Sequence, residues 1–342
     1  METPATRAAR VPGSDRFQAI LNPLKPGFAA LERFLAAEVE SFEPEVRPLV
    51  RYCFGHSGKK LRPVLVFSMA MDEETDFARD ETVKAAAIVE LVHLATLVHD
   101  DILDGADLRH RTETVVSRHG SHVAVLLGDA LFAHSLHLAS QFTDVTVCRE
   151  VSKATRQVCS GEIAQTFSRG SALPTRGQYF RMIELKTAEL FTVSAFLGGY
   201  LSGLPATALE AARRFARHLG VAYQIYDDAA DIFAEEAVAG KTLGTDLGTG
   251  KFTLPVLLWL EGIEPGLRDK AVGKVGQPDN GGLDVRRLLL DRGILGQVEE
   301  AFSRQLDQAV GAIRDIPGAA RQEQLQRLAA FLQQSWNKFS IR

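Results

Sequence analysis

Two aspartate-rich segments contain the residues most able to do chemistry. The segment at 100–104 reads DDILD and ends a long apolar stretch, and the segment at 227–231 reads DDAAD and repeats the spacing. On a helix, the first and last aspartates of each segment lie one turn apart on the same face. Paired carboxylates at the end of an apolar helix repel one another. Mg²⁺, which prefers hard oxygen ligands, relieves that repulsion.

One such segment on its own is more often a solvated helix end, or a helix end that meets a basic partner. The recurrence changes this interpretation, because two acidic clusters facing each other across a helical bundle would hold several Mg²⁺ ions between them. Mg²⁺ usually completes its coordination shell with substrate phosphates rather than with protein ligands alone. The pair of segments therefore predicts a polyphosphate ligand, which in turn requires basic residues.

Basic residues flank both acidic segments. A glycine-led helix start, SGKKLRP at 57–63, places two basic side chains one turn apart and makes a suitable anion site. The second acidic segment is followed by GKTLGTDLGTGK at 240–251, where small residues allow a ligand to approach the backbone closely. The flanking basic residues are Lys59, Arg62, Arg109, Arg111, Lys241 and Lys251.

Hydrophobic periodicity indicates that helices hold these residues. Alternating strand patterns are almost absent, and stretches rich in Ala, Leu, Glu, Arg and Gln recur at helical spacing. A polar loop is expected at 238–250 and a loose connection at 261–282. The expected helices begin at 28 and include 82–104, 121–141, 144–168, 176–202, 207–234 and 252–260, with two more within 296–338. The pattern predicts an all-α, single-domain fold over 16–342, preceded by a disordered lead-in at 1–15.

Composition excludes several classes of protein. The 342 residues include 39 basic and 43 acidic side chains, a net charge of -4 that argues against a general nucleic-acid or anionic-membrane binder. Three cysteines without CxxC spacing encode neither a disulfide framework nor a zinc cluster, which favours a reducing cytoplasm. The apolar stretch 85–98 is interrupted by Glu90 and His93 and is too short to span a bilayer, so no membrane insertion is expected.

The order of these motifs resembles that of the trans-isoprenyl diphosphate synthases, also called polyprenyl synthetases, over most of the chain. The similar elements are GKKLRP, GDALFA, GEIAQ, KTAELF, HLATLVHDDILD, YQIYDDAAD and GKTLGTDLGTGKFTLPV. The resemblance implies a helical bundle around a deep central cavity. It also implies a Mg²⁺-dependent homodimeric enzyme that condenses an allylic diphosphate with isopentenyl diphosphate, head to tail, to give a longer polyprenyl diphosphate.

The resemblance also assigns roles to individual residues. It implies metal ligation by Asp100, Asp104, Asp227 and Asp231, which would hold three Mg²⁺ ions, with Mn²⁺ as a substitute. It implies catalytic roles for Asp100, Asp104, Asp227, Lys186 and Lys241. Isopentenyl diphosphate would contact Lys59, Arg62, His93 and His110. The allylic diphosphate would lie among Arg109, Lys186, Thr187, Gln224, Lys241 and Lys251, and Asp228 would also contact substrate.

Two of these assignments have alternatives. A histidine on a buried helix is commonly a core residue, but His93 lies two turns before Asp100 and so faces the same side as the metal ligands. His110 stands where the family usually has a second arginine, and Arg111 is displaced by one position. Histidine lacks the bidentate fork of arginine, so either isopentenyl diphosphate binds more weakly here or Arg111 substitutes for the missing arginine.

Residues below the first acidic segment bear on product length. In short-chain members of the family, aromatic side chains four and five residues before the first aspartate form a floor; here these positions are Thr96 and Ala95, with Val92 further down. The resemblance therefore implies a product of C25 or longer, with geranylgeranyl diphosphate as the alternative. Phe132 on an opposite helix is a candidate floor. A phenylalanine at Ala95 is expected to shorten the product.

Three rival interpretations share part of this pattern. A class I terpene cyclase also ionises a diphosphate but usually carries a different second metal motif. A head-to-head condensing enzyme would not be expected to carry GKKLRP. A non-catalytic subunit of a heteromeric synthase typically has eroded aspartate motifs, whereas both are intact at 100–104 and 227–231.

Overall fold

The computed structural model describes residues 14–55, 58–72, 79–109, 112–168, 173–234, 245–273 and 284–340. Helices dominate these residues, which confirms the predicted all-α class. The sheet content of the described residues is one short antiparallel hairpin, β1 (Leu108–Arg109) with β2 (Thr112–Glu113).

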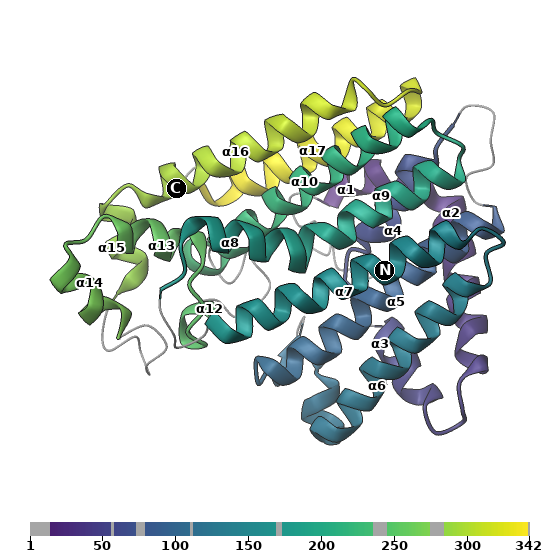
Figure 1. Cartoon of the computed structure of the whole chain (residues 1–342), viewed down its shortest axis with the longest axis horizontal. Helices are drawn as coiled ribbons and strands as arrows, with labels where there is room; N and C mark the ends of the chain where they lie inside the picture. The colour runs from purple at the N-terminus through teal and green to yellow at the C-terminus, as the bar shows by residue number, and fades with distance from the viewer. Residues whose placement is uncertain are drawn as a thin grey trace, which may run out of the picture.

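The helices form an elongated bundle in which α16 and α17 run along one long edge (Figure 1). Three short non-α helices are η1 (Asn22–Leu24), η2 (Val39–Ser41) and η3 (Glu184–Ala188). The α-helices are α1 (Ser14–Leu21), α2 (Lys25–Glu38), α3 (Arg47–Gly55), α4 (Leu61–Ala70), α5 (Asp80–Leu103), α6 (Val115–Ser140), α7 (Val145–Ser168), α8 (Arg176–Ile183), α9 (Glu189–Leu201), α10 (Ala206–Phe233), α12 (Thr245–Gly248), α13 (Leu254–Glu261), α14 (Pro265–Val272), α15 (Val285–Asp291), α16 (Ile294–Ile313) and α17 (Ala319–Ser340).

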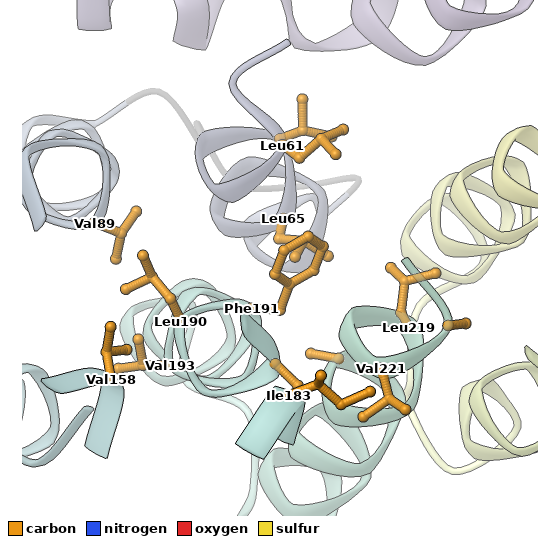
Figure 2. Packing of buried hydrophobic residues seen from close by; sticks show 14 of the residues in the cluster. Leu61, Leu65, Val89, Val158, Ile183, Leu190, Phe191, Val193, Leu219 and Val221 are labelled. Atoms are coloured by element: carbon orange, nitrogen blue, oxygen red, sulfur yellow. The ribbon is translucent and has the colours of Figure 1, made fainter. Parts of the chain in front are cut away.

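Helix α5 is the central element because it is apolar nearly all round and must be covered on every side. It packs against α2, α4, α6 and α9. Figure 2 shows Val89 of α5 in the core together with Leu190 and Val193 of α9 and Val158 of α7. Both α5 and α6 are long and apolar enough to cross a membrane by length and composition alone. The most apolar window of α5 is 72% buried inside the bundle, whereas that of α6 is only 39% buried.

The helix predicted at 176–202 contains an interruption. It begins at α8 with a capping box formed by Thr175 and Gln178, passes through one π-helical segment, η3, and continues as α9. Gly161 of α7 lies against this segment, because a Cβ atom there would be 2.6 Å from the backbone nitrogen of Lys186. Glycine therefore allows α7 to approach the π-turn closely.

The structure differs from three other expectations, which concern the lead-in, the loose connection and the polar loop. Helix α1 begins at Ser14, inside the predicted lead-in, and residues 1–13 lie outside the described residues. The loose connection expected at 261–282 contains α14, which begins at Pro265, a residue suited to the first helical turn because no donor is needed there. The polar loop expected at 238–250 includes the short helix α12.

Candidate functional site

A stripe of accessible side chains follows α5 up to the first acidic segment. Within residues 85–98, His93, Thr96 and Leu97 alone are not buried. Their spacing places them on the same face as Asp100 and Asp104. On a helix otherwise covered by its neighbours, this accessible face is the exception. It continues from the acidic segment down α5 as far as His93.

Two lysines from distant parts of the chain meet the first acidic segment. The Lys186 Nζ lies 3.6 Å from Asp100 Oδ2, and the Lys251 Nζ donates to Asp104 Oδ2 at 2.9 Å. Burial raises the pKa of Asp100 to about 6, with Lys186 opposing the shift and the neighbouring carboxylates of Glu162 and Asp104 reinforcing it. The segment is thus a pair of carboxylates, each met by one cation.

The GEIAQ motif of α7 holds Lys186 in place. The ammonium group pairs with Glu162 and donates to Gln165 Oε1 at 2.8 Å. These two side chains are three residues apart and so share one helix face, and Gly161 provides the close approach. Glu162 and Gln165 were not predicted as site residues from the sequence, although their spacing within the motif was a signal for them.

The second acidic segment contains a buried hydrogen-bond chain. The Tyr179 hydroxyl donates to Asp228 Oδ2 at 2.6 Å, and Gln224 Nε2 donates to Asp228 Oδ1 at 2.7 Å. The Thr187 hydroxyl in turn donates to Gln224 Oε1 at 2.7 Å. Burial raises the pKa of Asp228 to about 8, and the nearby carboxylate of Asp246 adds to the shift. Asp228, expected to contact substrate, presents its carboxylate to protein donors instead, because one oxygen accepts from Tyr179 of α8 and the other from Gln224 of its own helix.

Asp246 connects the two acidic segments. Its backbone N–H donates to Asp231 Oδ2 at 3.1 Å, and its carboxylate lies 3.5 Å from the Lys251 Nζ. Because Lys251 also contacts Asp104, a continuous polar path runs from the second segment to the first. The structure therefore links Asp231 and Asp104, two of the residues that the resemblance assigned to metal, through Asp246 and Lys251.

The start of α4 carries a buried guanidinium. Lys60, immediately before the helix, has a left-handed backbone (φ 51), uncommon for a residue other than glycine. Arg62 Nη1 donates to His93 Nε2 at 2.9 Å, and the guanidinium lies 4.9 Å from the centroid of the Phe191 ring. Figure 2 shows that ring beside Leu65 of α4. Since guanidinium only donates, the His93 nitrogen accepts, and the imidazole is neutral.

Lys59 lies between the second acidic segment and the C-terminal helix. Its Nζ is 5.3 Å from the centroid of the Phe331 ring on α17. Burial lowers the pKa of Lys59, the positive charge of Lys338 lowers it further, and the charge of Asp227 opposes both effects. The predicted isopentenyl diphosphate residues Lys59, Arg62 and His93 thus belong to the same region as Asp227.

The hairpin after α5 presents Arg109 to the first acidic segment. Both the Nε and the Nη2 of Arg109 lie 2.8 Å from Asp101 Oδ1, and Asp101 is buried. The guanidinium charge also opposes the raised pKa of Asp100. Among the predicted site residues, Lys241 and His110 lie outside the described residues, as does Arg111.

The predicted chain-length residues point in different directions. His99 contacts α6, with its Nε2 3.1 Å from the carbonyl oxygen of Val125. Ala95 and Val92 lie one and two turns below His99 on that same α6-facing side and are buried. Thr96 instead lies on the accessible stripe. Phe132 is 5.8 Å from the His99 ring, which places it level with the first acidic segment rather than at the base of the cavity.

The acidic residues suit a divalent cation that a ligand helps to bind. Carboxylate oxygens are the ligands that Mg²⁺ prefers. Within the part of the chain that the structure describes, no three Asp, Glu, His or Cys side chains are grouped closely enough to hold a metal by themselves. This fits a site in which phosphate oxygens complete the coordination shell.

Comparisons with known proteins give the family. The family model described as polyprenyl synthetase matches residues 43–286. The all-trans-nonaprenyl-diphosphate synthase (geranyl-diphosphate specific) of Rhodobacter capsulatus is 29% identical over 313 residues, which cover 91% of this chain and 95% of that protein. A geranylgeranyl diphosphate synthase of Methanosarcina mazei is 33% identical over 248 residues, 70% of this chain and 75% of that protein.

A solved structure also aligns over nearly the whole chain. The polyprenyl synthase of Caulobacter crescentus, complexed with calcium and isoprenyl diphosphate, is 28% identical and has a TM-score of 0.83. The alignment covers 92% of this chain and 97% of that one. Because the family model matches well over half of the residues, this chain belongs to the polyprenyl synthetase family.

Proposed function

We propose that this chain is a Mg²⁺-dependent trans-polyprenyl diphosphate synthase that makes a product of C25 or longer from isopentenyl diphosphate and an allylic diphosphate. The observation that carries the proposal is the meeting of Asp100 with Lys186 and of Asp104 with Lys251 above an accessible stripe of α5. Such a site has charges for a diphosphate, and the accessible face of α5 below them gives a course that a hydrocarbon tail would follow.

The acidic residues would hold the metal ions. Asp100 and Asp104 would bind on one side, and Asp227 with Asp231 on the other. When bound, Mg²⁺ supplies positive charge that stabilises the departing diphosphate. Lys186 and Lys251 add positive charge on the same side of the cavity, and their positions are fixed by Glu162 and Asp246. Preorganised charge of this kind acts strongly where water is excluded.

The remaining site residues position the second substrate and protect the reaction. Arg62, Lys59 and the neutral His93 would hold the diphosphate of isopentenyl diphosphate near Asp227. Leu97 on the accessible stripe of α5 would add apolar surface that keeps water from an allylic cation. The protein supplies no covalent nucleophile, and the proton released after carbon–carbon bond formation leaves to the pyrophosphate. Positioning and electrostatics therefore provide the catalysis.

The direct test is an assay of the purified chain alone. [¹⁴C]Isopentenyl diphosphate is supplied with dimethylallyl, geranyl, farnesyl or geranylgeranyl diphosphate and Mg²⁺, and dephosphorylated products are separated by chromatography. We expect incorporation that requires both substrates and yields chains of C25 or longer. Products stopping at C20 would favour the geranylgeranyl alternative. A cyclised hydrocarbon, or no product until a partner protein is added, would overturn the proposal.

The lysine–aspartate pairs predict an unusual pattern of metal affinity. In the absence of diphosphate, Lys251 competes with a cation for Asp104, whereas in its presence Lys251 has an anion to bind. Lys251→Gln is therefore expected to tighten Mn²⁺ binding to the protein alone and to weaken Mn²⁺ binding in the presence of inorganic pyrophosphate. Electron paramagnetic resonance of free Mn²⁺ measures both affinities without turnover.

The matched control is Lys270→Gln, which removes an exposed lysine on α14. It changes the net charge by the same amount, so a general electrostatic effect would appear in both variants. If Lys251→Gln shifts the two affinities in the same direction, the lysine does not exchange between the carboxylate and the diphosphate.

We also propose that the chain forms a homodimer through α6 and α7, which lie side by side in Figure 1. Large apolar side chains on these helices are exposed, with Leu126 at 68% and Phe167 at 79%. Val125 and Leu136 of α6 and Ile163 of α7 are exposed as well. A two-fold axis would let this surface cover its own copy, and burying it removes apolar area from water.

Leu126→Asp is expected to convert the dimer to a monomer, because it puts a charge where apolar area should be buried. Sedimentation equilibrium at several protein concentrations measures the change. Leu267→Asp on α14 is the control, since Leu267 is 57% exposed on another part of the molecule. A dimer that persists in Leu126→Asp would place the interface elsewhere. A wild-type monomer would favour a heteromeric assembly.

The proposed location is the cytoplasm. The cysteines Cys53, Cys148 and Cys159 are all free, and burial raises the pKa of the Cys53 thiol to about 12. Unpaired thiols are typical of a reducing compartment. The product would be lipid-like, but the burial of α5 inside the bundle accounts for its apolar sequence without a membrane.

A further inference from the structure

We propose that Tyr179 is a positioning residue for the allylic diphosphate, acting through Asp228 on Gln224 and Thr187. The inference rests on the proposed function, because it takes Gln224 and Thr187 as contacts of that diphosphate. Tyr179 was not predicted as a site residue from the sequence. It lies before the KTAELF motif, on a different turn of the helix. The structure places its hydroxyl beneath the second acidic segment.

Tyr179 joins two helices at one buried point. Its side chain is 1% exposed and belongs to α8, and its hydroxyl donates to Asp228 of α10 at 2.6 Å. The ring and its hydroxyl are therefore fixed by packing and by this hydrogen bond.

The donors and acceptors form a directed chain. Thr187 donates to Gln224 Oε1, so the amide of Gln224 must point its nitrogen the other way, where it donates to Asp228 Oδ1. Asp228 Oδ2 then requires a second donor, and Tyr179 is that donor. Each bond sets the orientation of the next group, so the hydroxyl of Tyr179 determines how Asp228 and Gln224 are held.

Gln224 is the accessible member of this chain, because Thr187 and Tyr179 at its two ends are buried. Asp228 is 4% exposed, while Gln224 and Asp227 on the same helix are half-buried and accessible. Thr187 lies in the π-turn directly after Lys186, which is 3.6 Å from Asp100. A displacement of Asp228 would therefore move Gln224 of α10 and Thr187 of η3, although substrate does not touch Asp228 itself.

A stabilising role alone explains the arrangement poorly. Asp228 is a buried carboxylate with the carboxylate of Asp246 nearby. A pair of well-packed apolar side chains is often at least as stable as buried charge held by hydrogen bonds. The chain of bonds gives orientation instead, which is what a group contacting a diphosphate requires.

The test is Tyr179→Phe, which keeps the ring and removes the hydroxyl. We expect the KM for the allylic diphosphate to rise about tenfold, the factor that corresponds to losing about 1.4 kcal/mol. We expect the KM for isopentenyl diphosphate to stay within about twofold, because Lys59, Arg62 and His93 do not contact the chain of bonds. A purely structural role would lower the melting temperature and the active fraction and leave both KM values unchanged.

A double-mutant cycle keeps the proposal testable if Tyr179→Phe folds poorly. Asp228→Asn removes the buried charge, so the double variant lacks the unpaired carboxylate that would destabilise Tyr179→Phe. If Tyr179 acts through Asp228, its removal in the Asp228→Asn background should change the allylic KM by less than about twofold. If Tyr179 and Asp228 acted independently, the fold-changes in the allylic KM of the two single variants would multiply in the double variant.

Tyr200→Phe is the matched control. Tyr200 also donates its hydroxyl to a carboxylate, Asp144, but both lie at the surface away from the site. Its kinetic constants should equal those of the wild type. Equal rises in both KM values in Tyr179→Phe, or unchanged KM values with only a lower melting temperature, would overturn the inference while leaving the wild-type activity, and thus the proposed function, intact.

Discussion

Asp100→Asn is expected to lower kcat about 10³-fold, because losing about 4 kcal/mol of transition-state stabilisation gives that factor. The same substitution is not expected to destabilise the fold. Burial penalises the charged form of Asp100, and its neighbours Glu162 and Asp104 repel it. A neutral amide removes these penalties, so the melting temperature should be unchanged or higher. Asp227→Asn should lower kcat similarly.

Steady-state kinetics in saturating Mg²⁺ and thermal unfolding followed by circular dichroism measure the two quantities. Asp307→Asn, on the exposed face of α16, is the control for removing one carboxylate, and its kcat should match that of the wild type. Near-wild-type turnover in Asp100→Asn or in Asp227→Asn would mean that the corresponding acidic segment does not bind the catalytic metal.

Thr96→Phe should shorten the product to C15 or C20 while leaving the total rate of prenyl transfer nearly unchanged. Thr96 lies one turn below Asp100 on the accessible stripe, so a ring there would project into the space a growing tail needs. The substitution loses only a local bond from the Thr96 hydroxyl to the His93 carbonyl at 2.7 Å. The metal and diphosphate residues are untouched. Chromatography of dephosphorylated products measures the change.

Two further variants separate tunnel blocking from other effects. Thr96→Val removes the hydroxyl without adding a ring, and its products should keep the wild-type length. Ala95→Phe, which the sequence favoured for shortening, is now expected to act differently, because Ala95 is fully buried on the side of α5 that faces α6. Overpacking there costs about 1–3 kcal/mol, so the melting temperature should fall. Unaltered products in Thr96→Phe would show that the tail does not follow this stripe.

The sequence predicted the all-α class and the main helices. These features depend on spacing along single helices, which sequence records directly. The four-residue interval from Asp100 to Asp104 fixes a shared face wherever the helix lies. Apolar residues all round α5 likewise required a central position. The prediction thus succeeded where each statement concerned one element.

The parts that were not predicted depend on contacts between elements. Nothing in the spacing of Tyr179 shows that its hydroxyl reaches Asp228 on α10. The α6-facing direction of Ala95 follows from where His99 contacts α6, which is a tertiary fact. Glu162 and Gln165 were visible as a motif, but their partner Lys186 could be identified only once α7 and η3 were placed side by side.

The π-turn η3 inserts one extra residue into the helix that runs from Arg176 to Leu201. Each residue of an α-helix advances the chain by about 100° around the axis, so everything after η3 is rotated by that angle relative to an uninterrupted helix. A designer who idealised this segment by deleting one residue near Leu185 would gain regular backbone bonding. The same deletion would change the register between α8 and α9, so that Tyr179 and Thr187 could no longer both face Asp228 and Gln224.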